Sequence, residues 1–127
     1  MSDLKIEGTP KTPTIEFNSK SGYILIKGRS IPENSVQFYK PLIAALEDYN
    51  KDPQPNTNVD IQLDYFNTSS SKCLLDIFKT LEVIHSRNSE VIVNWCYDED
   101  DDDMLEAGED YQDILKFTIK MISIKEI

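Results

Sequence analysis

The chain has 127 residues, of which 39% are hydrophobic and 28% charged, a balance typical of a globular domain. We therefore predict one domain over residues 1–127. The formal net charge of −10 disfavours nucleic acid and anionic membranes as partners, because both are bound through Lys and Arg. A protein with a basic surface is the partner that this charge favours.

The N-terminus lacks the charged-then-apolar pattern of a signal peptide, and no apolar run is long enough to span a bilayer. We therefore expect a cytoplasmic protein. Two cysteines occur, Cys73 and Cys96, and both lie in apolar stretches without CxxC spacing. This pattern predicts two reduced thiols in the core rather than a disulfide or a metal site.

The first predicted element is a β-hairpin. Its two extended runs cover 14–17 and 23–28, and the residues between them, Asn18 to Gly22, favour a turn. The preceding segment 9–13 contains two prolines and is predicted to be an extended arm. Apolar residues then recur at three- and four-residue steps from Val36 to Tyr49, which predicts a helix despite Pro41 within it.

Alternating elements follow a proline-containing loop at 50–58. The pattern predicts strands at 59–66, 90–97 and 117–124, a helix that ends near Ser86, and a short helix around 105–115. Strand–helix–strand units make parallel neighbours, and the hairpin adds an antiparallel edge. The predicted fold class is α/β: one mixed sheet in the order β-β-α-β-α-β-α-β, with helices packed on it.

The junction between the predicted strand at 59–66 and the following helix is the most informative feature. It reads Asn67-Thr68-Ser69-Ser70-Ser71, an amide followed by four hydroxyl side chains. A helix N-terminus offers unpaired N–H groups and partial positive charge, which favour a phosphate there. The same residue types are also ordinary helix caps, so the pattern alone leaves both readings open.

Two other features suggest chemistry less strongly. The acidic run from Asp98 to Asp103 resembles a calcium loop in its carboxylate spacing, but Asp103 stands where that loop needs glycine and a strand precedes it. His85, the one histidine, is predicted to end a helix rather than act as a base. The chain lacks a glycine-rich phosphate loop and a GxSxG motif, so we predict no catalytic residues, no metal and no cofactor.

Nearly the whole chain resembles the SiaC-type family of bacterial biofilm-regulation phosphoproteins. The resemblance rests on four segments together: 8–13 (GTPKTP), 32–35 (PENS), 63–70 (LDYFNTSS) and 93–98 (VNWCYD). More distantly, the unit from Phe66 to Ser70 is similar to the anti-sigma-factor antagonists of the STAS fold, in which the first Ser of a hydrophobic-Asp-Ser-Ser-Gly segment is phosphorylated. The chain departs from that segment by carrying Asn67 for Asp, Thr68 for Ser and Ser70 for Gly.

The resemblance implies a STAS-like, partner-switching regulator rather than an enzyme. A protein kinase would phosphorylate Thr68, and a metal-dependent PP2C-type phosphatase would remove the phosphate. The unphosphorylated form would bind and activate a diguanylate cyclase, and so raise cyclic di-GMP. The partner-binding residues expected around the phosphosite are Tyr65, Asn67, Thr68, Ser69, Ser70 and Lys72.

Three alternatives stay open at this point. The switch is retained but acts on an anti-sigma kinase; or the chain is a small hydrolase or transferase in which Asp64 activates Thr68; or the acidic run makes it a calcium-dependent adaptor. The sequence does not name the stimulus or the oligomeric state.

Overall fold

The computed structural model describes residues 3–87 and 89–125 of the chain, which form six strands and three helices. The N-terminal part contains β1 (Leu4–Ile6), β2 (Thr14–Asn18), β3 (Tyr23–Ser30) and α1 (Ser35–Tyr49). The remainder alternates strictly between strands and helices: β4 (Asn56–Phe66), α2 (Thr68–His85), β5 (Glu90–Asp98), α3 (Asp102–Ile114) and β6 (Thr118–Ile124).

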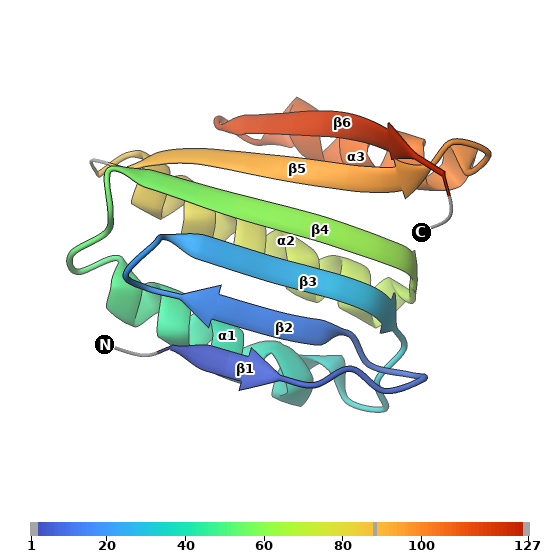
Figure 1. Ribbon diagram of the computed structural model, residues 1–127, viewed down its shortest axis with the longest axis horizontal. Helices are drawn as coiled ribbons and strands as arrows, with labels where there is room; N and C mark the ends of the chain where they lie inside the picture. The colour runs from blue at the N-terminus through green and yellow to red at the C-terminus, as the bar shows by residue number, and fades with distance from the viewer. Residues whose placement is uncertain (1–2, 88, 126–127) are drawn as a thin grey trace.

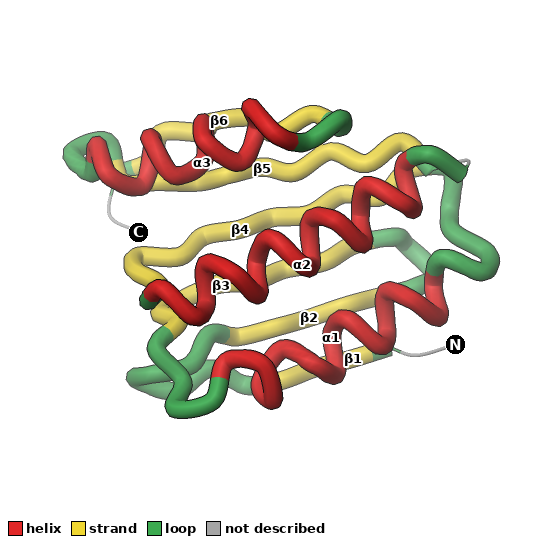
Figure 2. The backbone as a smooth tube through the Cα atoms, turned by 180° about the vertical axis from the view of Figure 1, so that it is seen from behind, coloured by secondary structure: helices red, strands yellow, loops and turns green. Residues whose placement is uncertain are grey.

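The six strands form one mixed sheet in sequential order, β1-β2-β3-β4-β5-β6 (Figure 1). β1, β2 and β3 are antiparallel neighbours, whereas β3 to β6 run parallel. A right-handed crossover places its helix on a fixed side of the sheet, so three crossovers in the same direction put all helices on one face. Figure 2 shows α1, α2 and α3 side by side on that face. Within the described part of the chain, no helix covers the opposite face of the sheet.

The α/β class, the mixed sheet and the hairpin are confirmed; one strand was not predicted, and the largest shifts in the bounds of the other elements are those of β4 and α3. Residues 4–6 form an edge strand, β1, where no element was predicted. β4 begins earlier, at Asn56. α3 begins at Asp102 rather than near 105, because Asp101 caps it by accepting a hydrogen bond from the Met104 N–H at 3.1 Å. Pro41 lies within α1, as expected.

The core fills the space between the sheet and the helices. Its centre is Trp95 of β5, fully buried among the rings of Phe66, Phe78 and Tyr111. Trp95 also donates its indole N–H to the Met104 carbonyl at 2.8 Å, which fixes the start of α3 over β5. α3 approaches closely because Gly108 faces the ring: a Cβ at this position would lie 2.6 Å from Trp95 Cδ1.

The two cysteines are buried free thiols, and they lie on different sides of the sheet. Cys73 belongs to the core on the helix-covered face, as predicted. Cys96 follows Trp95 in β5, so its side chain points to the helix-free face, and it is not part of the core cluster. The prediction of two buried, reduced thiols is therefore confirmed, with Cys96 buried on the helix-free side of the sheet. None of the described helices is long and apolar enough to cross a membrane.

Candidate functional site

The hydroxyl-rich segment forms the first turn of α2, directly after the carboxyl end of β4. The Asn67 backbone N–H donates to the Ser30 carbonyl at 3.0 Å, which anchors this turn to the end of β3. The Asn67 side-chain oxygen accepts a hydrogen bond from the Ser70 N–H at 2.9 Å, so Asn67 is the N-cap and Thr68 is the first helical residue. The capping role therefore belongs to Asn67 and not to Thr68.

Thr68 is the exposed and unengaged member of the hydroxyl cluster. Across the described residues, its hydroxyl makes no hydrogen bond, and the backbone N–H groups of Thr68 and Ser69 find no acceptor. The first turn of α2 also contains no acidic side chain. This turn therefore presents a free hydroxyl, two free donors and the positive end of a helix dipole, all of which suit a phosphate.

The next two hydroxyls are occupied by a network that joins α2 to α1 and β3. Ser69 Oγ lies 2.7 Å from Ser35 Oγ, and Ser35 is the first residue of α1. Ser70 Oγ lies 2.8 Å from Ser30 Oγ and also donates to the Ser30 carbonyl at 3.1 Å. Ser30 Oγ in turn contacts the hydroxyl of Tyr39, a fully buried residue of α1. Burial raises the pKa of Tyr39 to about 12.

The six residues expected to bind a partner do not share one environment. Tyr65 is 52% exposed at the end of β4, and Lys72 is exposed one turn beyond Thr68, on the same side of α2. Thr68 and Ser69 are also exposed, and Asn67 is partly buried. Ser70 is 0% exposed, so its side chain cannot touch a partner in this conformation. In this structure Ser70 holds the turn in place, and its role in partner binding stays a prediction.

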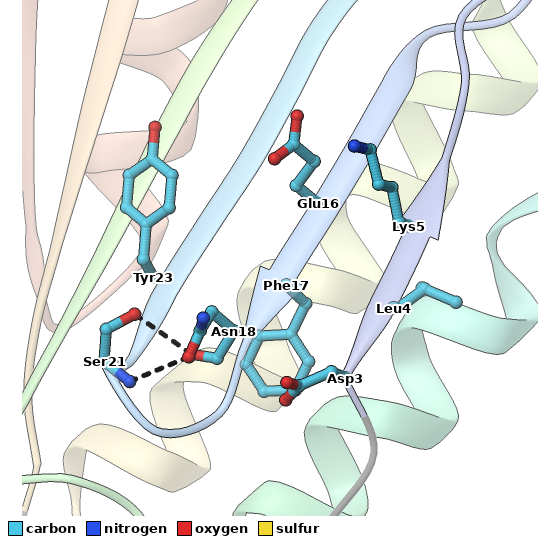
Figure 3. A pocket seen from close by; sticks show the side chains of 8 residues that line it. All are labelled: Asp3, Leu4, Lys5, Glu16, Phe17, Asn18, Ser21 and Tyr23. Carbon is cyan, nitrogen blue, oxygen red and sulfur yellow. Dashed lines mark hydrogen bonds between the residues drawn. The ribbon is translucent and has the colours of Figure 1, made fainter.

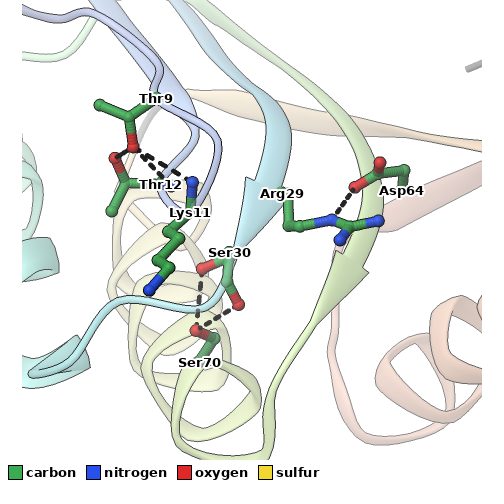
Figure 4. A network of polar contacts seen from close by, with 7 residues as sticks. All are labelled: Thr9, Lys11, Thr12, Arg29, Ser30, Asp64 and Ser70. Atoms are coloured by element: carbon green, nitrogen blue, oxygen red, sulfur yellow. Dashed lines mark hydrogen bonds and ion pairs between the residues drawn. The ribbon is translucent and has the colours of Figure 1, made fainter.

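Polar side chains from other strand ends surround this turn (Figure 4). Arg29, at the end of β3, forms an ion pair with Asp64 at 3.6 Å. The arm before the hairpin is folded back by its own hydrogen bonds, with Thr9 Oγ1 2.7 Å from Thr12 Oγ1, and the Lys11 carbonyl accepts from the Ile31 N–H. Asp64 is thus engaged by Arg29, and no described contact joins it to Thr68 as the small-enzyme alternative requires.

The acidic run lies between β5 and α3. Asp98 Oδ1 accepts from the Asp100 N–H at 2.9 Å, and Asp101 caps α3. A strand precedes the run, as predicted, whereas a calcium loop of the helix–loop–helix type follows a helix. Within residues 3–87 and 89–125, no three His, Cys, Asp or Glu side chains gather where they could hold a metal ion.

Two further candidates lie far from Thr68. His85, the last residue of α2, accepts the Val91 N–H at its Nδ1 (3.1 Å), which is a structural contact. A surface hollow of about 600 Å³ lies at the start of β3, the opposite end of the sheet (Figure 3). There, Tyr23 donates to Asp60 at 2.9 Å, and Asn18 accepts from the Ser21 N–H at 3.0 Å. The polar groups named here satisfy one another, which gives no indication of a ligand.

The mixed α/β sheet and a helix terminus that can accept a phosphate are features of a regulatory phosphoprotein. Comparison with known proteins identifies the family. The family model for SiaC family regulatory phosphoproteins matches residues 6–124. The chain therefore belongs to the SiaC family of regulatory phosphoproteins, as its sequence motifs predicted.

Particular relatives come from Pseudomonas aeruginosa. A protein of strain UCBPP-PA14 without an assigned function is 35% identical over 117 residues, which are 92% of this chain and 93% of that protein. SiaC of P. aeruginosa superposes with a TM-score of 0.88 at 33% identity, covering 98% of this chain and all of that chain. A chain in the crystal structure of the diguanylate cyclase SiaD in complex with its activator SiaC matches with a TM-score of 0.89 at 32% identity, covering 96% and 100%.

Sequence reasoning located the first turn of α2 but did not separate its four hydroxyls. Ser30 and Ser35, which engage Ser70 and Ser69, are 40 and 34 residues away in the chain. The one available signal was helical spacing: Ser70, Cys73, Leu74 and Ile77 share the buried face of α2, whereas Thr68 falls outside it.

Proposed function

We propose that this chain is a phosphorylation-controlled partner-switching regulator that acts in the cytoplasm and has no enzymatic activity of its own. The unphosphorylated form binds and activates a diguanylate cyclase. A cognate kinase phosphorylates Thr68 and so blocks binding, and a PP2C-type phosphatase restores it. The observation that carries this proposal is the exposed, unbonded Thr68 hydroxyl at the start of α2, in a chain similar to the SiaC that activates SiaD.

The physical basis of the switch is local. Phosphorylation adds nearly two negative charges and three acceptor oxygens at one position. The free N–H groups of Thr68 and Ser69 and the helix dipole stabilise that phosphate within the domain, so the fold is retained. A partner surface that packs against a neutral threonine would have to desolvate a dianion, at a cost of several kcal/mol. A loss of this size abolishes a micromolar contact.

Mass spectrometry of the protein purified from its own organism tests the phosphosite. We expect phosphate on Thr68 and not on Ser69, Ser70 or Ser71, since the structure leaves only the Thr68 hydroxyl both exposed and unbonded among these four. Phosphate mainly on Ser70 would overturn the assignment.

Titration calorimetry against the purified diguanylate cyclases of the same organism tests the switch. Wild-type chain and Thr68→Ala should bind one of them and raise its production of cyclic di-GMP. Thr68→Glu and the phosphorylated chain should bind it at least about tenfold more weakly, although one charge mimics nearly two only in part. Thr118→Glu, which adds the same charge at an exposed residue of β6 outside this site, is the control and should bind like the wild-type chain. Equal binding by Thr68→Ala, Thr68→Glu and the phosphorylated chain would end the claim that Thr68 controls the contact.

A further inference from the structure

An apolar groove runs between α2 and α3, beside the phosphosite. One hollow, of about 200 Å³, is lined by Phe66, Ser71, Ala107, Asp110, Tyr111 and Ile114. It shares Phe66 and Ala107 with a second hollow of about 260 Å³, which extends to Tyr65, Asp103 and Met104. Both are smaller than ordinary small-molecule pockets of roughly 300–1,000 Å³, so they suit side chains of a protein partner.

The groove exists because β4 and β5 separate at their carboxyl ends. Their pairing stops at Ile61 and Trp95, although β4 continues to Phe66 and β5 to Asp98. Figure 2 shows α2 and α3 beginning at this same end of the sheet, with their first turns apart. Two of the four exposed large apolar side chains among the described residues line this groove: Tyr65, 52% exposed at the end of β4, and Ile114, 54% exposed at the last residue of α3.

The two rims of the groove differ in charge. Segment 98–113, which covers all of α3 except Ile114, holds ten of the 23 acidic residues and none of the 13 basic ones, so the rest of the chain is balanced at 13 of each. Asp103 and Asp110, with Ala107 and Ile114, recur along the side of α3 that faces the groove. The α2 rim carries Ser71 and no acidic side chain in its first turn, Thr68 lies one turn before Ser71, and Lys72, one turn beyond Thr68, is the basic residue beside this rim.

We propose that this α2–α3 groove is the docking site for an amphipathic helix of the cyclase, with an apolar stripe and one flank rich in Lys and Arg. A helix fits because the groove walls are helices, and an added helix would continue the layer of α1, α2 and α3. Its basic flank lies along the acidic α3 rim, and its uncharged flank lies along the α2 rim. A second copy bound symmetrically through this groove is a poor occupant, because the acidic α3 of one copy would then face the acidic α3 of the other.

This arrangement explains how a negatively charged phosphate can block a partner that is itself attracted by the acidic α3 rim. The phosphate on Thr68 is added at the α2 rim, where the uncharged flank of the helix packs. The basic flank cannot reach it without leaving Asp103 and Asp110. The inference rests on the proposed function, and it adds the place and the chemistry of the contact.

Two matched pairs of variants test the groove by calorimetry with the purified full-length cyclase that binds the wild-type chain. Ile114→Ser should weaken binding at least about tenfold. Val83→Ser, a similarly exposed apolar position (50%) outside the groove, should stay within about twofold of wild type. Asp110→Lys should weaken binding about five- to tenfold and flatten its salt dependence, whereas Glu109→Lys, with the same charge change on the exposed side, should do so much less.

Circular dichroism and urea unfolding of all four variants show that each retains the fold. If Ile114→Ser and Val83→Ser bind alike while phosphorylation still blocks binding, the groove assignment is wrong and the proposed function stands. If Asp110→Lys and Glu109→Lys weaken binding equally, the proposed basic flank of the partner helix is wrong. If the wild-type chain binds no cyclase of its organism, the proposed function fails and this inference fails with it.

Discussion

The two flanks of α2 are built differently. Toward α1, the helix is locked by a chain of hydroxyl contacts, from Ser69 to Ser35 and from Ser70 through Ser30 to Tyr39. Toward α3, one side chain bridges the two helices, since the Tyr111 hydroxyl donates to the Ser71 carbonyl at 2.9 Å, but the first turns stand apart over separated strand ends and apolar side chains line a groove. Thr68 lies where these flanks meet. A modified residue can control an open surface without loosening the helix because the other flank holds that helix.

Alkaline unfolding should show the largest difference between the flanks. Burial raises the pKa of Tyr39 to about 12, whereas an unfolded tyrosine ionises near 10. The neutral phenol therefore contributes its full stabilisation below about pH 10, and this is lost as the pH rises toward 12. We expect a decrease of about 2–3 kcal/mol in the free energy of unfolding over that range, measured by urea titration.

Tyr39→Phe should remove the contribution of Tyr39 and leave that of Tyr23, whose pKa is also raised to about 12 by burial and by its hydrogen bond to Asp60. Tyr111→Phe, on the α3 flank, is the comparison: burial also raises the pKa of Tyr111, whose hydroxyl donates to the Ser71 carbonyl at 2.9 Å. A larger change from Tyr111→Phe than from Tyr39→Phe would reverse the assignment of the locked flank.

A substitution where α3 packs against the sheet should give the next largest change in stability. Gly108→Ala places a Cβ 2.6 Å from Trp95 Cδ1 and 2.7 Å from Met121 Sδ, so the helix must shift outward. Overpacking of this kind costs about 1–3 kcal/mol, measurable as a lower urea midpoint with an unchanged slope. The exposed neighbour Glu109→Ala should leave the midpoint unchanged. An unaffected Gly108→Ala would show that α3 adjusts freely over β5.

The smallest expected change in the free energy of unfolding is at Asn67 and Thr68, and it tests whether the capping residue and the proposed phosphosite are different residues. Asn67→Ala removes the acceptor of the Ser70 N–H and should lower the free energy of unfolding by about 1 kcal/mol. Thr68→Ala removes an exposed hydroxyl without a hydrogen bond and should change it by less than about 0.5 kcal/mol. Urea unfolding of both variants provides the comparison, and a cost for Thr68→Ala equal to that for Asn67→Ala would give Thr68 a structural role.

The sequence predicted elements that have a long periodic pattern. Strand alternation in β4 and the apolar faces of α1 and α2 were readable, because burial on one side repeats every two or about 3.6 residues. β1 was not, since three residues, Leu4 to Ile6, are too few to show alternation. Its strand character comes from pairing with β2, for example Lys5 with Glu16, which is a tertiary contact.

For the candidate site too, local sequence predicted the features that depend on neighbouring residues and not those that depend on tertiary contacts. Local sequence placed a helix terminus at Asn67 to Ser71, and composition identified the acidic stretch before α3. Neither pattern shows that Ser70 is buried, because that depends on Ser30 and Ser35 from other elements. The groove between α2 and α3 depends on where the pairing of β4 and β5 stops, a property of the assembled sheet.

The position of Asn67 as the cap has a consequence for how the signal is stored. In the proposed switch the cap and the phosphoacceptor are separate side chains, so adding or removing phosphate would leave the contacts that hold α2 intact. Cellular proteases act on the unfolded population, and a phosphate stabilised at the helix terminus would not enlarge that population. The signal would then be carried by the ratio of the two forms and not by the amount of protein. A cell could reverse it within the lifetime of one molecule, without new synthesis.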